Sequence, residues 1–107
     1  MRLHPDELNG IINAISPFLR KMPAELRLFG SRVDDDQRGG DIDLLLLLKS
    51  KELANSLRIN KHKIITQIYE NIGEQKIDLK IATQEDILQD AFLSVIFPKS
   101  VIAHQWE

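Results

Sequence analysis

The chain contains no cysteine in its 107 residues, which excludes disulfide bonds, thiolate nucleophiles and cysteine-ligated zinc. An excess of basic residues is also missing, because 14 Lys and Arg face 16 Asp and Glu, giving a formal net charge of -2. Broad binding to nucleic-acid phosphates needs clustered positive charge, so we expect no direct contact with nucleic acid.

Long apolar runs are absent as well. The longest, Leu44 to Leu48, is far shorter than the roughly 18 to 20 residues that span a bilayer. The first residues, MRLHPDELNG, contain no apolar signal core. These absences predict a cytoplasmic protein without a membrane segment.

The composition that remains, 43% hydrophobic and 28% charged residues, is typical of a compact globular domain. We expect a single domain over residues 1–107. So short a chain leaves little room for a separate recognition domain, so a large substrate would be held partly by another molecule. We therefore expect a partner, and whether the chain forms a homo- or hetero-oligomer stays open.

Apolar spacing predicts the order of helices and strands. We expect a helix over residues 5–22, with a possible kink at Pro17, and a strand over 25–29. The predicted elements after the loop are a strand over 41–49, a helix or turn over 51–58, a helix ending at Gly73, a strand over 76–82, and a helix from Thr83 to Pro98. The tail could pack on the core or on a partner. The pattern predicts an α/β (α+β) fold with a small mixed β-sheet flanked by helices.

Acidic residues mark two of these strands. Asp41 and Asp43 are two apart in a strand, so their side chains point to the same face. If the strand of Asp78 lies beside them, as a helical crossover permits, a third carboxylate reaches the same place. Carboxylates near a sheet are costly unless compensated, so the pattern predicts a cation, and oxygen ligands favour Mg²⁺ or Mn²⁺.

A phosphate-binding corner is predicted beside these acids. Gly30 and Ser31 end the strand over 25–29, where backbone N–H groups and a hydroxyl can hold phosphate oxygens. Taken alone, Asp-x-Asp usually marks a solvated strand entrance and a single glycine usually marks a turn. The acids of residues 34–36 are interpreted as a solvated loop, and no Walker P-loop is present.

The combined order of these motifs resembles the DNA polymerase beta type nucleotidyltransferase superfamily. Its marks are a hydrophobic-Gly-Ser corner, nine intervening residues, Asp-hydrophobic-Asp, and a later hydrophobic-Asp-hydrophobic strand. The chain is similar to minimal nucleotidyltransferases, which include the MntA antitoxins of HEPN/MNT toxin–antitoxin pairs. The resemblance covers about residues 5–97.

The resemblance implies a role for each matching residue. Gly30, Ser31 and Arg32 would bind the triphosphate of ATP, while Asp41 and Asp43 hold a metal ion. Asp78 would complete a second metal site and accept the proton of the acceptor hydroxyl. Two Mg²⁺ ions, or Mn²⁺, would then support transfer of AMP.

Two further basic residues belong to this resemblance, and one residue differs from the family pattern. Arg38 and Lys80 are further candidates for neutralising phosphate charge, after Arg32. Many relatives carry serine before the first metal-binding aspartate, where this chain has Gly40.

The implied acceptor is a tyrosine of a cognate HEPN ribonuclease toxin, which would make the protein an antitoxin that acts by AMPylation. An alternative is a non-catalytic antitoxin that neutralises the toxin by forming a complex. Modification of a small molecule such as an aminoglycoside is disfavoured, because those enzymes usually carry an additional domain.

Overall fold

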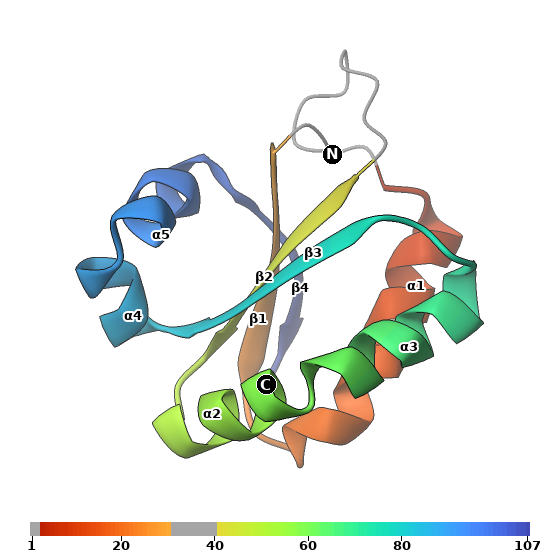
Figure 1. Ribbon diagram of the computed structural model, residues 1–107, viewed down its shortest axis with the longest axis horizontal. Coiled ribbons are helices and arrows are strands. Elements are labelled where there is room, and N and C mark those ends of the chain that lie inside the picture. The colour runs from red at the N-terminus through yellow and green to blue at the C-terminus, as the bar shows by residue number, and fades with distance from the viewer. Residues whose placement is uncertain (1–2, 31–40) are drawn as a thin grey trace.

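A computed structural model describes residues 3–30 and 41–107 of the chain, and a four-stranded mixed sheet forms its centre (Figure 1). The strands are β1 (Ala24–Phe29), β2 (Ile42–Leu48), β3 (Ile77–Thr83) and β4 (Val101–Trp106), in the order β3-β2-β1-β4. Strands β2 and β3 are parallel, whereas β1 is antiparallel to both β2 and β4. The predicted fold class, a small mixed sheet flanked by helices, is confirmed.

One face of the sheet carries the larger core. It is covered by α1 (Pro5–Ile15), η1 (Ser16–Leu19), α2 (Lys51–Ile59) and α3 (Lys61–Ile72). Alternate residues of β2 enter this core and are almost fully buried: Ile42, Leu44, Leu46 and Leu48. Helices α2 and α3 form the crossover that parallel strands require between β2 and β3.

The opposite face is covered in part by α4 (Gln84–Gln89), α5 (Ala91–Ile96) and the 3₁₀ turn η3 (Phe97–Lys99), drawn in blue in Figure 1. A smaller core lies beneath them, made of Phe29, Leu45, Ala82, Ile87 and Leu93. The acidic residues of β2 and β3 lie on this second face, because Asp43 alternates with buried Ile42 and Leu44.

The first helix is shorter than predicted. It ends at Ile15, and a 3₁₀ turn follows to Leu19. Pro17 has no N–H to continue the α-helical hydrogen bonds, and Arg20 and Lys21 then adopt positive φ angles of 54° and 63°. The backbone thus turns away before residue 22.

The prediction of one helix from Thr83 to Pro98 was wrong, since the segment forms α4 and α5. Asp90 between them is extended, with φ -100° and ψ 122°, and its side chain accepts a hydrogen bond from the Leu93 N–H. An aspartate that caps a new helix breaks the old one, although the apolar spacing continues across it.

Two segments left open by the sequence are now assigned. Residues 51–58 lie within helix α2, and the tail forms β4 at the edge of the sheet beside β1. Trp106 packs on the larger core and donates its indole N–H to Ser16 Oγ at 2.9 Å. In residues 3–30 and 41–107, no helix is long and apolar enough to cross a membrane.

Candidate active site

The pairing of β2 with β3 brings two carboxylates side by side. Asp43 and Asp78 are direct partners in the parallel register, so their side chains leave the same face of adjacent strands. The predicted neighbourhood of these two strands is confirmed. Asp41 precedes β2 by one residue, and its Oδ2 lies 3.7 Å from Lys76 Nζ.

These acids influence one another electrostatically. The pKa of Asp43 is raised above its ordinary value, first by burial and then by the negative charges of Asp78 and Asp41. Lys80 and Lys76 act in the opposite direction with smaller effect. The three carboxylates are therefore close enough to oppose ionisation of the central one.

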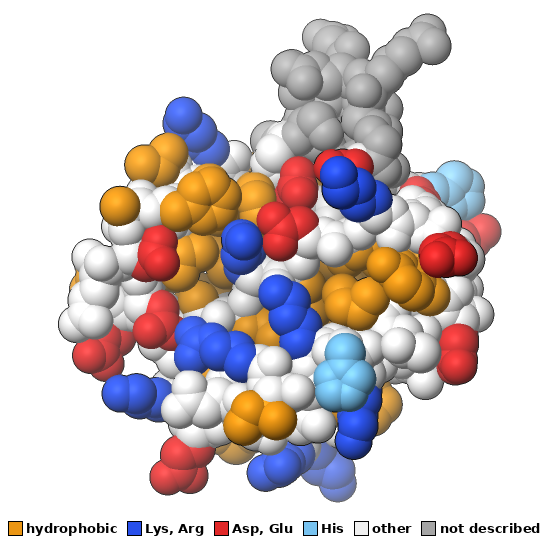
Figure 2. Space-filling view, in the orientation of Figure 1, with side chains coloured by type: hydrophobic (Ala, Val, Ile, Leu, Met, Phe, Trp, Pro, Cys, Tyr) orange, Lys and Arg blue, Asp and Glu red, His pale blue; other side chains and the backbone are white. Residues whose placement is uncertain are grey.

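Two lysines partly balance this charge. Lys80 Nζ lies 3.5 Å from Asp78 Oδ1, and Lys76 contacts Asp41. The side chains of Asp41 and Asp78 are 48% and 45% exposed, so both ion pairs are weak and both acids have room to rotate. Figure 2 shows acidic side chains gathered at this end of the molecule, with basic and apolar side chains beside them.

Gly30 closes the site on the side of β1. Its φ of 73° is rarely adopted by residues with a side chain, and a Cβ placed there would lie 2.2 Å from Asp43 Oδ2. The end of β1 therefore packs its backbone directly against the central carboxylate. The other residues predicted to bind phosphate, Ser31, Arg32 and Arg38, lie outside the described residues.

The described residues offer oxygen ligands but no closed metal cage. Among residues 3–30 and 41–107, no three His, Asp or Glu side chains are grouped tightly enough to hold an ion. Asp41, Asp43 and Asp78 still supply the acidic oxygens that hard cations prefer. A bound metal ion would take the place of Lys76 and Lys80 as the positive partner of these acids. To reach the ion, the side chains of Asp41 and Asp78 would have to rotate.

Two residues beside the acids were missed in the sequence. Lys76 lies two positions before Asp78 in an alternating segment, and that spacing could have placed it near the site. Phe92 was assigned to an apolar helical stripe, but its side chain is 52% exposed. Its ring meets Phe29 edge to face at 6.4 Å between centroids, and Lys80 Nζ lies 5.4 Å from its centroid.

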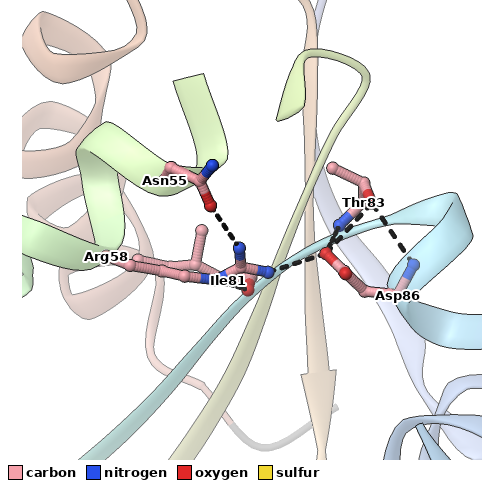
Figure 3. Close-up of polar contacts among 5 residues, drawn as sticks. All are labelled: Asn55, Arg58, Ile81, Thr83 and Asp86. Atoms are coloured by element: carbon pink, nitrogen blue, oxygen red, sulfur yellow. Dashed lines mark hydrogen bonds and ion pairs between the residues drawn. The ribbon is translucent and has the colours of Figure 1, made fainter. Parts of the chain in front are cut away.

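A second charged cluster joins α2 to the end of β3 (Figure 3). Arg58 donates hydrogen bonds to Asp86 Oδ2 at 2.7 Å, to the Ile81 carbonyl at 3.0 Å, and to Asn55 Oδ1 at 2.9 Å. The backbone N–H of Thr83, followed by Arg58, lowers the pKa of Asp86. This cluster fastens the crossover helix to the sheet.

The described surface is hollowed at one end of β3 and along its middle. The first hollow, of about 720 Å³, lies at the far end of the sheet from the acids and is lined in part by Ala24, Leu48 and Trp106. The other, of about 820 Å³, lies along β3 and includes Lys80 and Phe92 in its wall. Only the second shares a side chain with the acidic site.

Comparison with known families gives one match. The family model described as a nucleotidyltransferase domain matches residues 8–102, which include β1 to β3 and all the candidate site residues. Neither the curated proteins nor the solved structures gave a significant match.

Proposed function

The chain belongs to the nucleotidyltransferase domain family, and from this premise we propose that it transfers AMP from ATP to a protein hydroxyl group. Members of this family generally use a nucleoside triphosphate and a divalent metal ion. The proposal assigns the metal ligands to Asp41, Asp43 and Asp78, and the triphosphate to Gly30, Ser31 and Arg32.

One observation carries the proposal: Asp43 and Asp78 are paired in register on parallel strands, beneath the glycine that ends β1. Burial and two neighbouring carboxylates disfavour ionisation of Asp43 while no cation is present. Clustered carboxylates of this kind lower the stability of the fold. They suit a site that receives a cation together with a polyphosphate.

The proposed reaction is an in-line displacement at phosphorus. The acceptor oxygen forms a bond to the α-phosphorus, while the bond from that phosphorus to the oxygen bridging to the β-phosphate breaks and pyrophosphate leaves. Asp78 is the proposed acceptor of the hydroxyl proton. Bound Mg²⁺ or Mn²⁺ would lower the pKa of that hydroxyl and balance the charge of pyrophosphate.

A protein acceptor is favoured over a nucleic-acid end by the charge of the chain. A formal net charge of -2 provides no broad basic surface for a polynucleotide. The resemblance to MntA-type proteins suggests a tyrosine of a cognate HEPN ribonuclease toxin, and the protein would then act as its antitoxin.

The test is to incubate the protein with the candidate HEPN toxin, Mg²⁺ and ATP, and to measure the intact mass of the toxin. We expect the mass to rise by AMP. Asp43→Asn should remove this modification, whereas Asp6→Asn, at a side chain 91% exposed on α1, should retain it. Neutralisation of the toxin without a mass change would overturn the enzymatic proposal in favour of a binding antitoxin.

A further inference from the structure

We propose that the hollow along β3 binds the acceptor, and that it takes an acidic protein segment carrying a tyrosine. This inference rests on the proposed function, because it assigns the side from which the hydroxyl approaches. It adds a surface formed by Lys61, Lys80 and Phe92, which we call the acceptor groove.

The direction of approach follows from the chemistry and the strand order. An in-line displacement places the attacking and leaving oxygens on opposite sides of the phosphorus. With the leaving phosphates held at Gly30, which follows β1, an approach from the side of β3 meets this requirement, because β2 lies between the two strands. Asp78, the proposed proton acceptor, lies on that side.

Lys80 connects the acceptor groove with the acids. Lys80 Nζ contacts both Asp78 Oδ1, at 3.5 Å, and the ring of Phe92, at 5.4 Å from its centroid. The volume of about 820 Å³ lies within the range of about 300 to 1,000 Å³ typical of ligand sites. In Figure 2 a basic side chain lies between the apolar patch over α5 and the acidic group.

The charges in the wall favour an acidic occupant. The groove is lined by three cationic side chains, of Arg58, Lys61 and Lys80, against two carboxylates. Of these carboxylates, Asp86 is paired with Arg58, and Asp90 accepts from the Leu93 N–H. No acidic side chain in the described parts of the chain forms an ion pair with Lys61, which also lines the groove. A positive charge is therefore left for a ligand carboxylate.

Phe92 supplies the aromatic part of the recognition. More than half of its side chain is exposed although it borders a charged site. An exposed ring is a favourable contact for another aromatic ring, and a tyrosine that packs on it would direct its hydroxyl toward a nearby polar group. Lys80, whose Nζ lies 5.4 Å from the centroid of this ring, also contacts Asp78, the proposed proton acceptor.

The experiment uses the full chain and a synthetic peptide with one tyrosine flanked by two glutamates on each side. Binding is measured by fluorescence anisotropy, with Mg²⁺ and a non-hydrolysable ATP analogue. We expect Lys61→Glu and Phe92→Ala each to weaken binding at least about tenfold. The matched controls Lys63→Glu and Leu88→Ala, at exposed positions outside the groove, should bind like the wild type.

Affinity for the ATP analogue is measured on the same proteins, so that the two proposals can fail separately. Unchanged nucleotide affinity in Lys61→Glu, together with lost peptide binding, supports the acceptor groove. Equal peptide affinity in Lys61→Glu and wild type overturns it, and so does equal binding of a peptide flanked by lysines. A wild-type protein that does not bind the ATP analogue instead overturns the proposed function.

Discussion

Two carboxylates of this small domain have pKa values shifted in opposite directions, although both lie beside β3. Asp86 receives hydrogen bonds from Thr83 and Arg58, and its pKa is lowered. Asp43 is more deeply buried and faces Asp78 and Asp41, and its pKa is raised. Within residues 3–30 and 41–107 no group donates a hydrogen bond to Asp43.

The difference separates a structural acid from a candidate functional acid. The fold supplies every donor that Asp86 needs, so that residue connects α2, β3 and α4. Among the described residues Asp43 has no comparable donor, and such conflicts are expected where a ligand completes the site. The following predictions test this contrast.

The largest expected effect is on catalysis at the uncompensated acid. Asp43→Asn keeps the size of the side chain but removes the charge that would hold a metal ion. We expect the rate of AMP transfer to fall at least about a hundredfold, measured as modified acceptor per unit time. The far-ultraviolet circular dichroism spectrum should stay unchanged, and a fully active variant would contradict the assignment of Asp43.

The next effect concerns the glycine against this acid. In Gly30→Ala the new Cβ collides with Asp43 Oδ2, so we expect activity to fall at least about tenfold beyond any loss of stability. Gly73→Ala is a matched control, since Gly73 also has a positive φ, of 91°, with nothing within 4 Å of the added atom. Both variants carry backbone strain of about 1 kcal/mol, but only the first should lose transfer. Equal activity in the two would mean that the packing of Gly30 on Asp43 is irrelevant to function.

A smaller effect is expected at the compensated acid. Asp86→Ala removes the partner of the Thr83 N–H and of Arg58, and should lower the free energy of unfolding by about 1 kcal/mol at neutral pH. Because folding lowers the pKa of Asp86, its contribution to stability is present above the ordinary pKa of 3.8 and disappears as the pH falls through the lower pKa of the folded state. Urea unfolding of wild type and variant at neutral and acidic pH measures this. A difference that persists in strong acid would show that packing, rather than charge, is lost.

The smallest effect is a stabilisation. Folding raises the pKa of Asp43, so the wild type loses stability as the pH rises from 3.8 through the folded value. Asp43→Asn avoids this loss. We expect the variant to unfold at a slightly higher urea concentration at neutral pH, with a free energy of unfolding raised by less than about 1 kcal/mol. The measurement needs a chelator, because a bound cation would stabilise only the wild type. A less stable variant in chelator would contradict the electrostatic account.

The sequence predicted the central part of the site because its geometry is local and periodic. Alternation fixes the face of Asp43 and of Asp78, and a helical crossover favours parallel pairing of their strands. The registration of these two residues needed the structure, since a shift of two residues would keep the same faces but would separate the two carboxylates. The roles of Ser31 and Arg32, which lie outside the described residues, stay predictions.

Prediction from the sequence failed where a single side chain interrupted a longer apolar pattern. Asp90 interrupts an apolar helical stripe by capping a second helix, so the environment of Phe92 was not foreseen. The tail was undecided because β4 depends on a distant partner. Arg27 Nε donates to Ser100 Oγ at 2.6 Å across 73 positions of the chain, and no local signal announces such a contact.

The pairing of β4 with β1, which lie far apart in the chain, affects the order in which the sheet can form during synthesis. Strands β2 and β3, which carry the acids, leave the ribosome before β4, so they can pair while one edge of β1 is still open. An open edge is prone to join other chains until it is covered. Arrival of β4 therefore covers this edge of β1, which is then paired on both sides, a task separate from the chemistry of the site.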